Sequence, residues 1–162
     1  MKNLRIGTGY DLHRLEAGGR CVLGGVEIPS DKGLRGHSDA DCLTHAICDA
    51  LLGAAGLPDI GQHFPDTEEA YRGIDSQELL RQISAILRDL RYKIVNADAT
   101  VIAETPKLAS HRSAMIATLA ESMDISPAQV NVKATTNEGV DAIGRGEAIA
   151  AHAVCLLIRG TP

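Results

Sequence analysis

The chain of 162 residues is long enough to bury about two-thirds of the surface of its unfolded form, so we expect one domain over residues 1–162. Its net charge of −5 provides no basic surface for nucleic acid, and we expect none as a partner. Because aromatic residues make up only 2% of the chain, the core must be built from aliphatic side chains.

The compartment is inferred from the cysteines and from the absence of targeting patterns. No apolar run approaches the length of about 20 residues that spans a bilayer, and the N-terminus lacks the pattern of a leader peptide. Cys21, Cys42, Cys48 and Cys155 lack the close pair spacings of zinc or thioredoxin-like motifs. Buried free thiols are typical of a reducing compartment, so we expect a cytoplasmic protein.

Strands and helices alternate through the first half of the chain. Residues 4–13 predict a strand, and residues 21–29 predict two short strands around a Gly-Gly pair. Over residues 41–54 apolar side chains recur at helical spacing, which predicts a helix with one buried stripe. Residues 75–90 predict a second such helix with a capped start at its aspartate.

The second half continues the alternation. Residues 92–103 predict a strand, 115–123 a helix, and 126–129 a brief helical turn with serine as its cap. Residues 130–134 and 147–159 predict the last strands, the final one so apolar that we expect it to be buried on both faces. The expected class is α/β (α+β), a small mixed sheet with helices packed on one face.

The stretch RIGTGYDLHR contains two candidate sites. Its two glycines suggest a dinucleotide-binding loop, but the third glycine of that motif is Leu12 here and no helix is predicted to follow. Asp11 and His13, two residues apart in a strand, project from the same face. They can share a metal ion, or they can simply form an exposed strand end.

A third candidate ligand, His45, lies in the first predicted helix. Asp41, His45 and Asp49 fall one turn apart on a polar face distinct from the apolar stripe. The two carboxylates are placed to accept the second ring N–H of the histidine, as the outer partners of metal ligands do. A solvated acidic face is the alternative. With Asp11 and His13, His45 would complete a zinc site whose open fourth position is typical of catalytic zinc.

Six stretches in register, covering nearly the whole chain, closely resemble the 2-C-methyl-D-erythritol 2,4-cyclodiphosphate synthase family of the non-mevalonate isoprenoid pathway. They read GYDLHRL, GGVEIP, GHSDADCLTHAICDALLGAAGLPDIGQHFPDT, NADATVIAETPKL, VNVKATTNE and GRGEAIA. The resemblance implies a homotrimer of α/β subunits with active sites between subunits. It also implies conversion of 4-diphosphocytidyl-2-C-methyl-D-erythritol 2-phosphate to the 2,4-cyclodiphosphate, with release of CMP.

The same resemblance implies the site residues. The zinc ligands of the family correspond to Asp11, His13 and His45, and the ligand of its second divalent ion, Mg²⁺ or Mn²⁺, corresponds to Glu138. The residues that stabilise the transition state correspond to His37 and Thr136. The implied substrate contacts are Asp11, His13, His37 and Ser38 beside the metal; Asp59, Ile60, Gly61, Phe64, Pro65, Asp66, Thr67 and Glu68 around the methylerythritol; and Ala103, Lys107, Leu108, Ala109, Thr135, Thr136, Glu138 and Arg145 around the nucleotide and phosphates.

One segment departs from the family pattern. After Glu138 the family commonly continues with Lys-Leu-Gly and an aromatic residue, whereas this chain has Gly-Val-Asp and then Ala142. Arg145 and Glu147 are retained, and pairing between subunits is expected of them. Two other functions stay open on the residues alone. One is a zinc-dependent phosphohydrolase that uses the same three ligands, and the other is an inactive trimeric nucleotide-binding module.

Overall fold

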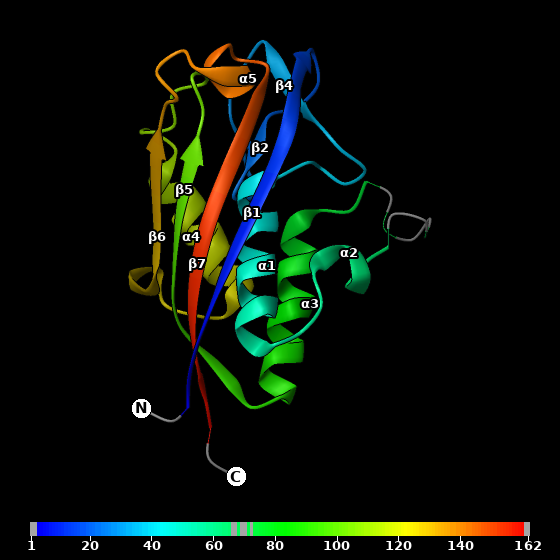
Figure 1. Cartoon of the computed structure of the whole chain (residues 1–162), viewed down its shortest axis with the longest axis vertical. Helices are drawn as coiled ribbons and strands as arrows, with labels where there is room; N and C mark the ends of the chain where they lie inside the picture. The colour runs from blue at the N-terminus through cyan, green and yellow to red at the C-terminus, as the bar shows by residue number, and fades with distance from the viewer. Residues whose placement is uncertain (1–2, 66–67, 69–70, 72, 161–162) are drawn as a thin grey trace.

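The structure is a computed structural model that describes residues 3–65, 68, 71 and 73–160. Among the described residues, strands come first and are followed by a group of helices, and strands and helices alternate from Tyr92 onward (Figure 1). The elements are β1 (Leu4–Ala17), β2 (Val22–Leu23), β3 (Val26–Glu27), β4 (Lys32–Arg35), α1 (Cys42–Ala55), α2 (Ile60–His63), α3 (Ser76–Asp89), β5 (Tyr92–Ile102), α4 (Arg112–Met123), the 3-10 helix η2 (Pro127–Gln129), β6 (Val130–Thr135), α5 (Asp141–Gly144) and β7 (Ala148–Arg159).

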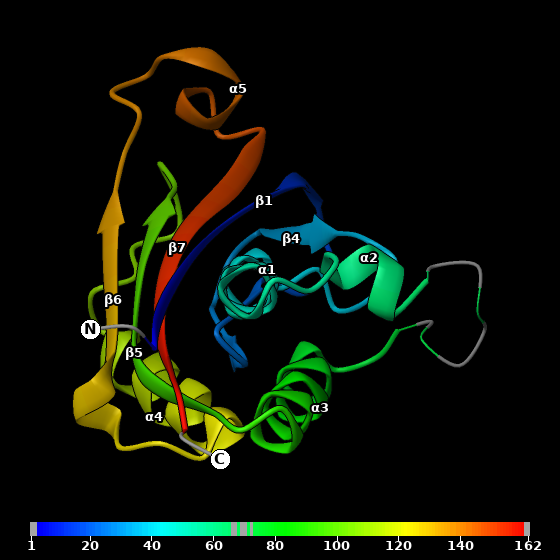
Figure 2. The ribbon, with the colours of Figure 1, turned by 60° about the horizontal axis from the view of Figure 1, so that its bottom comes forward.

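A five-stranded mixed sheet forms the centre of the molecule, in the order β4-β1-β7-β5-β6. Strands β5 and β6 are parallel, and the other neighbouring pairs are antiparallel. Strands β2 and β3 form a separate hairpin. Helices α1, α3 and α4 lie on one side of the sheet (Figure 2). The expected class, a small mixed sheet with helices on one face, is confirmed.

Helix α1 is the most deeply buried element. Its buried residues include Leu43, Ile47 and Leu51 on the predicted stripe, but also Thr44 and Cys48 outside it. The prediction of a single buried stripe was therefore wrong. Strands β1 and β7 cover one side of the helix while α3 covers another, so little of its surface is left for solvent.

The two glycines of RIGTGYDLHR allow β1 to lie against the backbone of α1. A Cβ atom on Gly7 would lie 2.1 Å from the carbonyl oxygen of Ala50, and one on Gly9 would lie 2.0 Å from that of Ala46. These distances are far below van der Waals contact, and the obstacle in both cases is helix backbone. The glycines serve close strand–helix packing, and no dinucleotide loop is formed.

Gly9→Ala is expected to destabilise the fold by about 3 kcal/mol, because β1 must move away from α1 to admit the methyl group. Urea unfolding measures the effect. The matched control is Gly53→Ala on the exposed side of α1, where the nearest atom to a new Cβ would be 3.9 Å away. That change is expected to stabilise the helix by about 0.5 to 1 kcal/mol. Equal free energies of unfolding for the two variants would contradict this account of the packing.

The face of the sheet opposite the helices is exposed in the single chain. Along β1, Ile6 and Tyr10 are 71% and 50% exposed, and Val154 of β7 is 43% exposed. Cys155 and Leu157 of β7 point to the helices and are fully buried. The prediction that the last strand is buried on both faces was wrong over residues 153–158, where burial alternates because the long helices pack on the same side. Residues 148–151 at the start of β7 are all buried.

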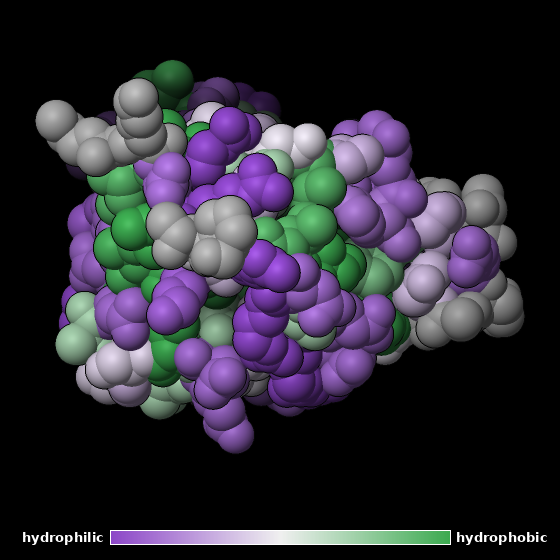
Figure 3. Space-filling view, turned by 90° about the horizontal axis from the view of Figure 1, so that it is seen from below, coloured by the Kyte–Doolittle hydropathy of each residue, from purple (hydrophilic) through white to green (hydrophobic). Residues whose placement is uncertain are grey.

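Apolar surface also reaches the end of the molecule that carries both termini, where it lies among hydrophilic side chains (Figure 3). Leu4 at the start of β1 and Ile158 near the end of β7 are neighbours in the sheet there, and both are exposed. Leu4 and Ile158 lie on the same face of the sheet as Ile6, Tyr10 and Val154, so apolar side chains on this face extend to the end that carries the termini. Among the described helices, none combines the length and apolar character needed to cross a membrane.

Candidate metal centre

Three predicted metal ligands converge in the structure. Strand β1 directs Asp11 and His13 toward α1, and His45 projects from the first turn of α1 to meet them. Asp11 Oδ2 lies 3.0 Å from His13 Nε2 and 2.9 Å from His45 Nδ1. The two ring nitrogens are 3.2 Å apart. Thus one carboxylate oxygen and two imidazole nitrogens, from elements 32 residues apart, face a common point.

The outer nitrogen of each imidazole has a polar partner that selects the tautomer. His13 Nδ1 lies 3.0 Å from the carbonyl oxygen of Arg35, so this nitrogen donates and Nε2 keeps its lone pair for the cluster. His45 Nε2 lies 2.8 Å from Ser76 Oγ and 3.2 Å from Ser38 Oγ. A proton on Nε2 donated to a serine leaves the lone pair of Nδ1 directed at the cluster.

The distances and the donor set fit a zinc ion. Zinc bonds of about 2.05 Å in a tetrahedron place neighbouring ligand atoms about 3.3 Å apart. The three ligand atoms here are 2.9 to 3.2 Å apart, and all lie within 4.8 Å of one another. Two neutral imidazoles and a carboxylate are ordinary zinc ligands, and three protein ligands leave a fourth position for substrate. The protein therefore has a possible metal-binding site at Asp11, His13 and His45.

The charges of the cluster are strongly coupled. Burial raises the pKa of the Asp11 carboxyl, but hydrogen bonds with the two imidazoles outweigh it and hold that pKa well below its usual range. For His45, burial lowers the pKa, while the Asp11 carboxylate more than offsets this and leaves the pKa above its ordinary value. Asp11 therefore stays ionised over the neutral range, and the raised pKa of His45 means that its imidazole takes up a proton at a higher pH than a free imidazole does.

We expect metal affinity to weaken as the pH falls through the raised pKa of His45. A proton on Nδ1 occupies the lone pair that the metal needs, so affinity should drop about tenfold per pH unit below that pKa and level off above it. Titration calorimetry with Zn²⁺ between about pH 8 and pH 6 measures the slope. An affinity that stays constant over this range would contradict His45 as a ligand.

The outer partners of His45 differ from those predicted. Asp41 is fully buried and its carboxylate accepts hydrogen bonds from the backbone N–H groups of Gly24, Gly25 and Thr44 and from the Thr44 hydroxyl. It caps α1 and holds the β2–β3 hairpin. Asp49 accepts from the backbone N–H of Ile60 at 2.8 Å. The prediction that these two carboxylates accept the second ring N–H of His45 was wrong, because both are committed to backbone.

The residues that do orient His45 come from an element far along the chain. Ser76, the first residue of α3, is buried and contacts His45 Nε2. Its hydroxyl in turn donates to Asp39 Oδ1, and its backbone N–H donates to Asp39 Oδ2 at 3.0 Å. Both residues were missed by the sequence analysis. The acidic residues just before α1 could have pointed to Asp39. Ser76 gave no signal in the sequence, because it reaches His45 only through the packing of α3 against α1.

A cavity of about 180 Å³ opens beside the metal ligands. His13 and His45 form its inner wall, and His37 and Ser38 from the loop before α1 lie beside them. Predicted residues on its rim are Ile60, Gly61 and Phe64, whereas Tyr71, Ile74 and Leu79 line it without having been predicted.

The remaining predicted residues of this segment lie around α2. Asp59 is exposed and caps α2 by accepting from the backbone N–H of Gln62 at 3.0 Å. Pro65 is half-buried and Glu68 is exposed. Asp66 and Thr67 lie outside the described residues.

The predicted nucleotide residues gather at a second cavity, of about 190 Å³, between the loop after β5 and the end of β6. Its lining shares no residue with the cavity beside the metal ligands. The residues that line it are Ala103, Pro106, Lys107, Leu108, Ala109, Ala134, Thr135 and Thr136.

Glu138 lies next to this second cavity. Its Oε1 accepts from Thr136 Oγ1 at 3.3 Å, and its backbone has a left-handed φ of 51°. Glu104, which the sequence analysis did not assign, orders this turn by accepting from the backbone N–H of Asn137 at 3.0 Å and of Gly139 at 3.3 Å. The single chain therefore brings Thr136 and Glu138 together, at a cavity whose lining includes none of the candidate metal ligands.

The segment that departs from the family pattern forms its own turn before β7. Asp141 Oδ1 accepts from the backbone N–H of Ile143 at 2.8 Å, and Oδ2 accepts from the Asn137 amide at 2.9 Å. Arg145 pairs with Glu147 of the same chain at 2.9 Å. Both side chains are exposed in the single chain, and the expected pairing of these residues between subunits stays a prediction.

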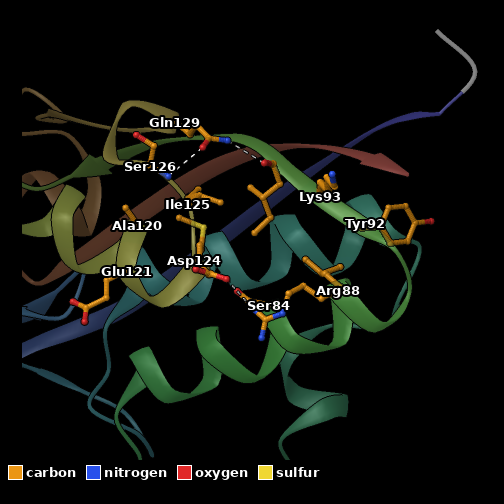
Figure 4. Close-up of a pocket in the computed structure, with 13 residues that line it drawn as sticks. Ser84, Arg88, Tyr92, Lys93, Ala120, Glu121, Asp124, Ile125, Ser126 and Gln129 are labelled. Atoms are coloured by element: carbon orange, nitrogen blue, oxygen red, sulfur yellow. Dashed lines mark hydrogen bonds and ion pairs between the residues drawn. The ribbon is translucent and has the colours of Figure 1, made fainter. Parts of the chain in front are cut away.

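A larger cavity, of about 550 Å³, lies between the ends of α3 and α4 and the start of β5 (Figure 4). Several of its polar side chains are already engaged. Arg88 pairs with Asp124 at 3.5 Å, and the Gln129 amide donates to the backbone carbonyl of Val95 at 2.8 Å. Because no carboxylates and imidazoles converge there, this cavity lacks the chemistry of the metal cluster.

Solved structures of similar shape carry the same fold. The bifunctional IspDF from Campylobacter jejuni superposes with a TM-score of 0.93 and 38% sequence identity, covering 97% of this chain and 42% of that longer chain. The CDP complex of IspF from Plasmodium falciparum superposes with a TM-score of 0.87 and 34% identity, covering 99% of both chains. This chain thus corresponds to the whole of the second protein and to one part of the first.

Sequence comparison gives the family. The 2-C-methyl-D-erythritol 2,4-cyclodiphosphate synthase of Desulfosudis oleivorans is 59% identical over 155 residues, which are 96% of this chain and 92% of that protein. The enzyme of the same name from Thiobacillus denitrificans is 54% identical over 160 residues, 99% of this chain and 100% of that protein. The resemblance found in the six motifs is confirmed. Since the YgbB family model matches residues 4–158, the chain belongs to the YgbB family.

Proposed function

We propose that this chain, as a single catalytic domain of residues 1–162, converts 4-diphosphocytidyl-2-C-methyl-D-erythritol 2-phosphate to the 2,4-cyclodiphosphate and CMP. The convergence of Asp11, His13 and His45 beside an open cavity carries the proposal. In this reaction an oxygen of the 2-phosphate bonds to the β-phosphorus, and the bond from that phosphorus to the CMP oxygen breaks. The reaction belongs to the phosphorus–oxygen lyases, as do the family members of that name.

The proposal includes zinc at Asp11, His13 and His45 and a second divalent ion, Mg²⁺ or Mn²⁺, at Glu138. When bound, these ions withdraw negative charge from the phosphoryl oxygens in the transition state and from the departing CMP. The donor sets support the assignment, since imidazole nitrogens suit zinc and an exposed carboxylate suits Mg²⁺ or Mn²⁺.

The protein groups act mainly by positioning. The attacking phosphate is already an anion, so no strong general base is needed and most of the rate must come from orientation and charge stabilisation. His37 and Ser38 lie beside the metal ligands, where they can donate to phosphate oxygens. Thr135 and Thr136 line the nucleotide cavity and offer hydroxyls to the diphosphate. Lys107 adds a positive charge at its rim.

Other side chains hold the two ends of the substrate. The methylerythritol hydroxyls are assigned to the α2 segment, and the cytosine to backbone groups of the loop after β5. Arg145 is assigned to the phosphate end. The proposed methylerythritol residues are Asp59, Ile60, Gly61, Phe64, Pro65, Asp66, Thr67 and Glu68, and the proposed cytosine residues are Ala103, Leu108 and Ala109.

A homotrimer with active sites between subunits is part of the proposal. Within one chain the metal cavity and the nucleotide cavity have no lining residue in common, which supports a site that a neighbouring subunit completes. The exposed apolar face around Ile6, Tyr10 and Val154 offers a surface for such contacts. A cytoplasmic location is proposed because all four cysteines are free and buried.

CMP release tests the proposed reaction. With the diphosphocytidyl substrate, Zn²⁺ and Mg²⁺, the protein is expected to form CMP and no inorganic phosphate. The second candidate, a zinc-dependent phosphohydrolase, rests on the open fourth position of the same three-ligand cluster, where a bound water could react. Release of inorganic phosphate, or of a linear bisphosphate beside CMP, would favour that alternative, and absence of CMP would contradict the proposed reaction. Binding of CDP without any turnover would instead match an inactive nucleotide-binding module.

A further inference from the structure

The nucleotide cavity has two walls that belong to different elements. Leu108 and Ala109, from the loop between β5 and α4, form one wall, and Thr135 and Thr136 at the end of β6 form the other. The width of the cavity therefore depends on how the loop is held against β6. Any residue that fixes this spacing controls nucleotide binding without touching the nucleotide.

The loop ends at a helix start that has no ordinary cap. His111 stands at the N-cap position of α4 but makes no side-chain hydrogen bond to the first turn. The next residue, Arg112, reaches across to β6 instead. Its Nε donates to the backbone carbonyl of Val132 at 2.7 Å, and its Nη2 donates to Asn131 Oδ1 at 2.6 Å. Two directed bonds from one guanidinium thus tie the end of the loop to the strand.

The acceptors of Arg112 are themselves fixed. The Asn131 amide donates to Asp98 Oδ1 at 2.8 Å, and Lys133 pairs with the same carboxylate. Asp98 lies on β5, so the network connects α4, β6 and β5. Strand β6 is the last in the sheet order, and β5 is its one neighbour in the sheet among the described residues. Arg112 thus supplies a hydrogen-bond donor to a carbonyl of this edge strand.

The loop and β6 are not in close contact along the whole of this wall. A cavity of about 250 Å³ lies behind the loop, between Arg112 and Met115 on α4 and residues 132–134 on β6. Leu108, Ala109 and Ala134 line both this cavity and the nucleotide cavity. Leu108 packs in the core, but the space behind Ala109 separates this part of the loop from β6, and the bonds of Arg112 bridge it.

We infer that Arg112 is a positioning residue for the cytidine nucleotide, because its bonds to Val132 and Asn131 set the spacing between the loop and β6. The inference rests on the proposed function, which assigns this cavity to the cytidine diphosphate part of the substrate. Arg112 is absent from the lining of the nucleotide cavity, so its effect on binding is indirect.

Arg112→Ala tests the inference with CDP as the probe. The dissociation constant for CDP, from titration calorimetry, and KM are each expected to rise about tenfold, while kcat stays within about twofold. Zn²⁺ affinity should be unchanged, because the metal cluster lies at a separate cavity. Arg112→Lys keeps one donor and should restore part of the CDP affinity. The control is Arg81→Ala on α3, which removes an exposed pair with Glu78 and should change none of these values.

Unchanged CDP affinity and KM in Arg112→Ala would overturn the inference, even if the melting temperature falls, because the role would then be structural. The same holds if Arg112→Lys binds CDP no better than Arg112→Ala. If the wild-type protein fails to bind CDP, the proposed function loses its nucleotide assignment together with this inference. If the wild-type protein binds CDP and Arg112→Ala binds it equally well, the inference about Arg112 is overturned while the proposed function stands.

Discussion

Replacing His45 by glutamine is expected to lower kcat/KM at least about 1000-fold, a loss of roughly 4 kcal/mol of transition-state stabilisation. The substitution removes one of three ligands from a cluster whose atoms lie 2.9 to 3.2 Å apart. Bound zinc, measured by elemental analysis of the purified protein, should fall in parallel. CDP affinity should fall much less than kcat/KM, because the residues that line the nucleotide cavity do not include His45 and still hold the cytidine.

His152→Gln is the matched control for this substitution. His152 is exposed on the sheet face away from the helices, where its ring packs at a tilt against Tyr10 with a centroid distance of 4.7 Å. Its loss should leave zinc content near the wild-type value and should lower kcat/KM far less than the loss of His45. Full activity of His45→Gln with normal zinc content would contradict the role assigned to the cluster, and so would an equal loss of activity in both variants.

Asp41→Ala is expected to destabilise the fold by about 4 kcal/mol. The fully buried carboxylate accepts four hydrogen bonds, which join the start of α1 to the β2–β3 hairpin. Its removal costs about 1 kcal/mol for the helix cap and leaves buried donors of Gly24, Gly25 and Thr44 without an acceptor, at about 1 to 3 kcal/mol for such a group. The free energy of unfolding in urea measures the loss.

Asp75→Ala is the matched control, because it removes a helix cap of the same kind from an exposed position. Asp75 caps α3 from an exposed position with one hydrogen bond, to the backbone N–H of Gln77 at 2.9 Å. Its loss should cost about 1 kcal/mol. If Asp41→Ala cost no more than Asp75→Ala, the burial and the links to the hairpin would contribute nothing, and the structural role given to Asp41 would be wrong.

Features set by neighbouring residues could be predicted from the sequence. Asp75 at the start of α3 and Ser126 at the start of η2 both cap as expected, because capping depends on groups within one turn. The pairing of Asp11 with His13 on one face of β1 follows from the period of a strand. His45 could be added because the polar residues of α1 repeat at helical spacing.

Features set by tertiary packing could not be predicted in this way. Helical spacing predicted Asp41 as a partner of His45. It could not predict that the Asp41 carboxylate accepts hydrogen bonds from the β2–β3 hairpin, because the hairpin reaches α1 only in the folded chain. Ser76 became a partner of His45 only because α3 packs beside α1. The exposed face of β7 likewise follows from where the helices lie, since apolar composition does not tell which face another element covers.

Phosphorus NMR of the reaction products tests the central claim most directly, because CMP forms by cyclisation and by hydrolysis at the same phosphorus. With the diphosphocytidyl substrate, Zn²⁺ and Mg²⁺, the spectrum should show CMP and two mutually coupled phosphorus signals of equal intensity from a cyclic diphosphate. A linear bisphosphate beside CMP, whose two phosphorus atoms show no coupling to each other, would contradict cyclodiphosphate synthesis.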